Sequence, residues 1–159
     1  MDKKEKELLL KTEFCNRLPY GLKCLVDIDA TEFDEFTGKD IGFKGKAVGE
    51  LYLVDVNDNH VELYFEGDDP VSNELSDMSM EGLLTIDDCQ PYLRPMSSLT
   101  KEEKQYYDIS LDLGYAEAYN EEIYTATKMI DFFSSHHLDN RNLIEKGLAL
   151  EAPEGMYKI

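Results

Sequence analysis

The residues best suited to chemistry lie at positions 134–141, which read SSHHLDNR. Imidazole and carboxylate groups bind transition metals and exchange protons near neutral pH, so a metal site and an acid–base site are the first hypotheses. Successive side chains on a helix are about 100° apart, so His136 and His137, at a helix end, would point to different faces and could not share one ion. Asp139 instead predicts the N-cap of a short helix over 140–146. We therefore predict no metal and no cofactor, and expect Asp139→Asn to cost little stability.

A second stretch, DVNDNHVELYFE at 55–66, is similar to a calcium-binding loop. Oxygen-bearing side chains occupy positions 1, 3, 5 and 12 of that loop pattern: Asp55, Asn57, Asn59 and Glu66. His60, however, stands where the loop needs a glycine, and the flanking residues alternate as in strands. The stretch therefore predicts a β-hairpin whose turn is formed by residues 57–59.

The cysteines, the glycine-rich stretch and the N-terminal apolar run match no motif for catalysis, ligand binding or membrane insertion. Cys15, Cys24 and Cys89 have neither zinc-site nor disulfide-framework spacing, which favours a reducing compartment. The glycine-rich stretch 38–49 fits no phosphate-binding pattern and predicts a flexible loop. The apolar run Leu8–Leu10 is too short for a signal peptide or a membrane span, so we expect a cytoplasmic protein without membrane contact.

The charge of the chain is the strongest compositional signal. The net charge is −18, and residues 27–88 hold eighteen Asp or Glu side chains against three Lys. Such a surface repels phosphate backbones, so direct binding to nucleic acid is not expected, whereas a protein partner with a basic surface is. The candidate contacts are acidic pairs in two polar loops expected at 31–45 and 67–80: Asp34, Glu35, Asp68 and Asp69.

The apolar periodicity predicts an α+β fold. An amphipathic helix is expected over 3–18, and strands are expected over 21–30, 47–56, 60–66 and 83–86, with 90–95 extended. These strands predict a small antiparallel sheet, either a barrel of SH3-like type or a curled sheet. The N-terminal helix and a C-terminal helical segment complete it.

The helical segment begins at a capping box formed by Thr100 and Glu103. The helix that follows is expected to reach about residue 111, and a longer helix is expected over 117–136. We predict one domain over 1–159. It would contain a β-rich part at about 20–95, a helical part at about 98–147 and a short tail at 148–159.

Two blocks of the sequence resemble a known family. They are CQPYLRPMSSLTKEEK at 89–104 and HHLDNRNLIEKGLALEAPEGMYK at 136–158. The family comprises short proteins without an assigned activity that are encoded by phages and mobile elements of gut Bacteroidales. The chain departs from the family pattern at Leu138, Asn140 and Asn142. The resemblance implies a bacterial cytoplasmic setting and phage ancestry, and it supplies no catalytic residues.

Two classes of function follow from these observations. The first is a non-enzymatic acidic module that binds an intracellular bacterial or phage protein. In its sharper form this module inhibits a nucleic-acid-binding or defence protein by mimicking DNA charge. The second class is a small enzyme whose carboxylate and histidine site is assembled from dispersed residues. Because no catalytic motif is present, we predict the binding module and no enzyme.

Overall fold

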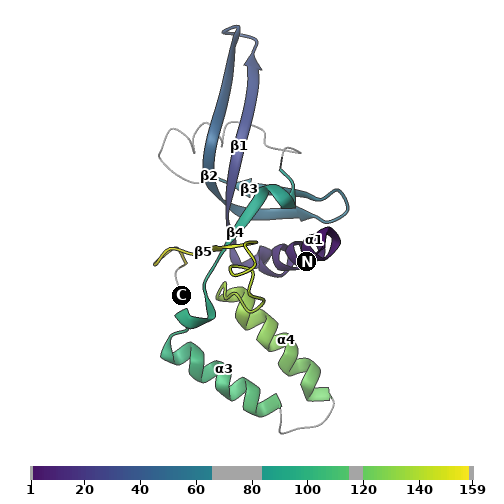
Figure 1. Cartoon of the computed structure of the whole chain (residues 1–159), viewed down its shortest axis with the longest axis vertical. Helices are drawn as coiled ribbons and strands as arrows, with labels where there is room; N and C mark the ends of the chain where they lie inside the picture. The colour runs from purple at the N-terminus through teal and green to yellow at the C-terminus, as the bar shows by residue number, and fades with distance from the viewer. Residues whose placement is uncertain (1, 66–83, 115–119, 158–159) are drawn as a thin grey trace. The chain divides into compact units, whose positions relative to one another are not determined.

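The computed structural model describes residues 2–65, 84–114 and 120–157, and Figure 1 shows their helices and strands. The chain divides into two compact units, Met1–Pro91 and Tyr92–Ile159. Among the described residues, the first unit contains one α-helix and most of the strands, and the second contains two long α-helices. The predicted α+β class is therefore confirmed.

Helix α1 spans Lys3–Arg17 and confirms the predicted N-terminal helix. It begins at Asp2, whose carboxylate accepts a hydrogen bond from the backbone N–H of Glu5 at 2.8 Å. Its core-facing side carries the buried side chains of Leu10 and Phe14, one turn apart. Beside them, Glu13 and Arg17 form a buried ion pair at 2.8 Å.

The strands form a mixed sheet of order β3-β2-β1-β4-β5. They are β1 (Lys23–Asp34), β2 (Lys39–Asp55), β3 (His60–Tyr64), β4 (Cys89–Leu93) and β5 (Leu150–Glu151). Neighbouring strands are antiparallel except β4 and β5, which are parallel. Across the described strands the sheet stays open and does not close into a barrel. The SH3-like relationship stays a prediction.

The core of the first unit follows the alternation of β1 and β2. Cys24, Val26 and Ile28 of β1 are buried, whereas Asp27 between them is exposed. Opposite Cys24 in the register lies Gly49 of β2. A Cβ atom at Gly49 would lie 2.8 Å from the Leu63 Cβ and 2.9 Å from a ring carbon of Phe65, so glycine allows β3 to approach closely.

The predicted polar loop at 31–45 is wrong, because β1 and β2 continue through it as one long hairpin. Their register runs without interruption from Lys23 opposite Glu50 to Asp34 opposite Lys39. The connection is only residues 35–38, where Gly38 adopts the left-handed angle φ 65° that the turn requires. Glycines favour a loop by residue type, but a strand that is paired along its length tolerates them. The predicted acidic loop at 67–80 lies outside the described residues.

Two shorter elements also differ from the prediction. In place of a strand over 83–86, the described part has a single bridge between Thr85 and His60, and a 3-10 helix Ile86–Asp88 follows. In place of a helix over 140–146, the chain forms consecutive turns. Asn142 has the left-handed angle φ 56°, which interrupts an α-helix at that point.

The second unit is built around helices α3 (Lys101–Gly114) and α4 (Asn120–Ser135). The predicted capping box is confirmed: the Glu103 N–H donates to the Thr100 hydroxyl at 3.1 Å, and the Thr100 N–H donates to the Glu103 carboxylate at 2.7 Å. The helices contact each other through aromatic rings, with Tyr106 stacked on Phe132 at 5.0 Å. Among the helices that the structure describes, none has the length and apolar character needed to cross a bilayer.

The close approach at Gly49 gives the first prediction. Gly49→Ala should lower the free energy of unfolding by about 1–3 kcal/mol, because the added methyl group must displace Leu63 or Phe65. Urea unfolding followed by circular dichroism measures this cost. The matched control is Val48→Ala, at the exposed neighbouring position, which should cost much less. Equal costs for the two variants would contradict the packing argument.

Candidate functional site

The four acidic residues predicted to bind a partner fall into two groups. Asp34 is the last residue of β1, and Glu35 is exposed at the start of the connection to β2, so the structure brings this pair to the hairpin tip. Asp68 and Asp69 lie outside the described residues. Of the two predicted acidic pairs, the structure therefore describes the position of Asp34 and Glu35.

Phe36 is the residue at this tip that the charge analysis missed. Its side chain is 101% exposed, the highest value among the large apolar residues of the described chain. A phenylalanine in water loses the free energy of about 1.5–3 kcal/mol that burial would give. The sequence did hold a signal for this residue, because Phe36 and Gly38 belong to the short connection between two alternating segments.

The hairpin extends beyond its neighbours in the sheet, as Figure 1 shows for β1 and β2. In the described residues, β4 pairs with β1 only at Cys24–Val26, and β3 pairs with β2 only at Glu50–Asp55. From Asp27 opposite Lys46 to Asp34 opposite Lys39, the two strands pair with each other and with no other strand that the structure describes. We call this two-stranded segment, residues 27–46, the hairpin arm.

The charge of the hairpin arm is concentrated toward its tip. Near the base, the register places Asp27 opposite Lys46 and Asp29 opposite Lys44, so acids and bases balance. Residues 32–40 hold four acids and one lysine, a net charge of −3. The arm therefore ends in an acidic segment that carries the fully exposed ring of Phe36.

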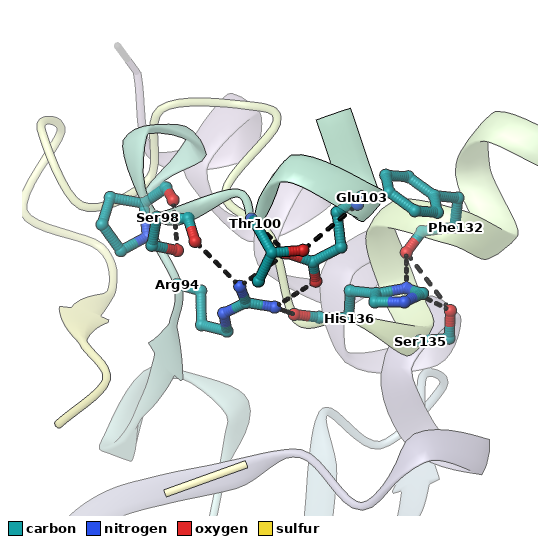
Figure 2. A network of polar contacts seen from close by, with 8 residues as sticks. Arg94, Ser98, Thr100, Glu103, Phe132, Ser135 and His136 are labelled. Carbon is teal, nitrogen blue, oxygen red and sulfur yellow. Dashed lines mark hydrogen bonds and ion pairs between the residues drawn. The ribbon is translucent and has the colours of Figure 1, made fainter. Parts of the chain in front are cut away.

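In the second unit, polar contacts converge on Arg94, as Figure 2 shows. Its guanidinium donates two hydrogen bonds to the Glu103 carboxylate, at 2.8 and 3.1 Å. It also donates to the backbone carbonyl oxygens of His136 at 3.2 Å and Ser98 at 3.1 Å. Arg94 thus joins the end of β4 to the start of α3 and the end of α4.

This network lowers the pKa of Glu103 from 4.5 to about 2. The largest cause is the hydrogen bonding from Arg94, which favours the ionised carboxylate, and burial opposes it. The Thr100 hydrogen bonds and the Arg94 charge lower the pKa further. Glu103 is therefore a structural anion that stays ionised at neutral pH.

Backbone contacts join the two sequence blocks that carry the family resemblance. The Arg94 N–H donates to the His137 carbonyl oxygen at 2.7 Å, and the Asp139 N–H donates to the Arg94 carbonyl oxygen at 2.8 Å. Nearer the C-terminus, the Tyr157 hydroxyl donates to the Tyr92 carbonyl oxygen at 2.8 Å. The two blocks, which are far apart in the sequence, are therefore connected by hydrogen bonds in the fold.

The two adjacent histidines have different surroundings. Both follow α4 instead of ending it, and His137 has the left-handed angle φ 52°. The His136 ring lies 4.5 Å from the Phe132 ring, whereas the His137 ring stacks on Tyr157 at 3.7 Å. Within the described ranges no group of three or more His, Cys, Asp or Glu is arranged to hold a metal ion.

Asp139 caps backbone groups as predicted, but it caps a turn and not a helix. One carboxylate oxygen accepts from the Leu143 N–H at 2.7 Å, and the other accepts from the Ile144 N–H at 2.9 Å. These donors lie four and five residues further along the chain, whereas the donors to a helix N-cap lie two or three residues further along. The buried carboxylate therefore uses both of its oxygens.

The calcium-like stretch is a hairpin over its described part, as predicted. The Asp55 carboxylate accepts from the backbone N–H groups of Asn57 and Asp58, at 2.9 and 3.3 Å. Asn59 adopts the left-handed angle φ 57° that ends the turn before β3. Glu66, the last position of the loop pattern, lies outside the described residues.

Two of the three cysteines are poor nucleophiles. Burial raises the pKa of Cys24 well above its usual value, and it raises the pKa of Cys89 to about 12, with a smaller effect from the Asp88 charge. A thiol reacts as its thiolate, so both remain unreactive at neutral pH. Their role is to fill the sheet core, and they give the enzyme alternative no nucleophile.

The second unit also contains an open groove of about 600 Å³ between α3 and α4. Its lining residues come from the first turns of α3 and the end of α4: Thr100, Glu102, Glu103, Tyr106, Lys128, Asp131, Phe132, Ser135 and His136. Sequence reasoning did not identify this groove, because its residues approach one another only when the two helices pack.

The Arg94–Glu103 pair gives the second prediction. Glu103→Gln should lower the free energy of unfolding by on the order of 3 kcal/mol at neutral pH, because glutamine keeps the cap but leaves the Arg94 charge without its counter-ion. The pKa of Glu103 is lower in the folded chain than its ordinary 4.5, so its contribution is complete above that value and lost as the pH falls toward 2. The difference between wild type and variant in urea unfolding should shrink from about pH 6 to about pH 3.

The control for this experiment is Glu102→Gln, because Glu102 is an exposed neighbour on the same turn. It should change stability by less than about 0.5 kcal/mol. A cost for Glu103→Gln that does not change with pH would show that the Glu103 charge is not the stabilising feature.

Asp139 gives the third prediction, which revises the sequence expectation. Asp139→Ala should cost about 2 kcal/mol, because two buried N–H donors lose their acceptor. Asp139→Asn should cost roughly half as much, since its amide offers one oxygen and turns an NH2 group toward the other donor. Urea unfolding compares both with Asn140→Ala, an exposed neighbour. An asparagine variant as stable as wild type would show that one acceptor is sufficient.

Comparisons of the chain with protein families, with curated proteins and with solved structures find no match. The family resemblance of the two sequence blocks therefore stays a prediction. The function has to be inferred from the residues and geometry of the chain itself.

Proposed function

We propose that the chain is a non-enzymatic protein-binding module that contacts a basic partner protein with the tip of its hairpin arm. The observation that carries this proposal is Phe36, fully exposed at the end of a two-stranded ribbon. An isolated two-stranded hairpin is only marginally stable in water, and among the described strands this ribbon has no neighbour on either edge. Its length and its exposed aromatic end are explained if the tip is buried in a complex.

The tip combines two properties of protein-binding surfaces. Aromatic side chains are frequent among the few residues that contribute most of the binding free energy, and Phe36 is an aromatic residue exposed at the tip. The acidic side chains of residues 32–40 would attract a basic surface and accelerate encounter. The partner should therefore present an apolar pocket surrounded by Lys and Arg.

The setting that we propose is the bacterial cytoplasm, with an origin in a phage or mobile element. The two resembling sequence blocks and the absence of disulfide-framework spacing support this proposal. A partner whose basic surface normally holds nucleic acid would be blocked when the acidic tip occupies it. Inhibition of a nucleic-acid-binding or defence protein is the sharper form of the proposal.

The fourth prediction concerns the hairpin tip. A photo-crosslinking phenylalanine analogue at position 36 should capture the partner from a bacterial host lysate, and the same analogue at position 8 should not. Leu8 is the matched control, because its side chain is 68% exposed on α1, away from the hairpin tip. With the captured partner purified, Phe36→Ser should weaken binding at least tenfold in biolayer interferometry, as expected for a central aromatic contact. Leu8→Ser should leave the affinity within about twofold.

The contribution of charge is tested separately on the same partner. Reversal of Asp34 and Glu35 to Lys should slow association, and wild-type association should also slow as salt rises, because salt screens exposed charges. Reversal of Asp68 and Asp69 shows whether the second predicted pair contributes. If neither higher salt, nor reversal of Asp34 and Glu35, nor Phe36→Ser changes the affinity or the association rate, the proposed role of the hairpin arm is refuted.

A further inference from the structure

The groove between α3 and α4 has an aromatic wall built from three rings. Tyr106 stacks on Phe132 at 5.0 Å with an interplanar angle of 28°, and Phe132 lies 4.5 Å from His136. Phe132 is buried between its two neighbours, whereas the side chain of Tyr106 is 46% exposed. The groove therefore offers a flat aromatic surface to a ligand.

His136 lines the same groove, and the contacts of its Nδ1 atom define the tautomer of its ring. Its Nδ1 atom lies 2.9 Å from the Phe132 carbonyl oxygen, which can only accept, as Figure 2 shows. In the neutral ring, Nδ1 therefore carries the proton, and Nε2 is left as the acceptor. Two further contacts fix the orientation of the His136 ring. They are the neighbouring ring of Phe132 and the Ser135 hydroxyl, which lies 3.1 Å from Nδ1.

The charged side chains at the rim favour a cation. Glu102 and Asp131 are exposed carboxylates that line the groove from α3 and α4, and Lys128 is the lining cation among the described residues. Glu103 lines the groove as well, but its charge is neutralised by Arg94. Two carboxylates and an imidazole thus line the same groove as the aromatic rings.

We infer that this groove binds an arginine side chain of a protein or peptide. A guanidinium is flat and cationic and has five N–H donors, so it can stack on Tyr106 while donating to carboxylates and to the His136 Nε2. A lysine ammonium lacks the flat face, and an anion would meet the two carboxylates. This inference does not rest on the hairpin arm, which belongs to the first unit.

The fifth prediction tests this inference with a small probe. In 15N–1H correlation spectra of the full chain, N-acetyl-arginine amide should shift the signals of Tyr106, Asp131 and His136 and saturate in the millimolar range expected for one side chain. The citrulline analogue has the same shape without the charge and should bind at least fivefold more weakly. Asp131→Asn should weaken arginine binding about three- to fivefold, the size of an exposed ion pair.

Two controls separate binding from general effects. Phe36→Ser should leave the arginine titration unchanged, so failure of the hairpin proposal and failure of this one are distinguishable. Tyr106→Leu should reduce the preference for arginine over lysine while an apolar group still covers Phe132. Equal shifts with arginine and citrulline, tighter binding of N-acetyl-glutamate amide, or shifts spread away from the groove would overturn the inference.

Discussion

The second unit depends on one part-buried ion pair, the bidentate contact between Arg94 and Glu103. Removing two charges from water is costly, and only good geometry with additional hydrogen bonds offsets that cost. The carbonyl oxygens of Ser98 and His136 and the cap at Thr100 supply those bonds. A lysine could not replace Arg94, because a single ammonium cannot reach a carboxylate and two separate carbonyl oxygens in this fixed pattern.

Because Arg94 also bonds through its backbone to His137 and Asp139, the start of α3 and the turns after α4 are fixed to one residue of the chain. The groove described above depends on this arrangement, since its two walls are the helix segments that Arg94 holds. The adjacent histidines then have a structural explanation. His136 closes the aromatic row of the groove, and His137 supports Tyr157 near the C-terminus.

Local patterns were readable from the sequence, and contacts made by packing were not. The capping box at Thr100 and the turn at Asn57–Asn59 involve neighbours in the chain, so residue type and spacing were sufficient. Between Arg94 and Glu103 in the sequence lie a proline and a 3-10 turn, and no sequence-spacing rule predicts an ion pair across such a segment. The hairpin arm was not predicted, because its glycines favour a loop by residue type whereas their strand conformation depends on pairing with the partner strand. The exposure of Phe36 follows from that pairing. Asp139 was correctly assigned to capping, but the left-handed Asn142 changed which N–H groups it reaches.

The two-stranded pairing of the hairpin arm also has a consequence for local stability. Its residues pair with neither β3 nor β4, so the arm can open from the tip without disrupting the pairing of those strands. Backbone amides should therefore exchange with deuterated water fastest near residues 35–38 and progressively more slowly toward Cys24. Such an arm can adapt its end to a partner while its base stays fixed. A comparison of amide exchange in the free chain and in the complex would then show which residues of the arm become protected when the partner binds.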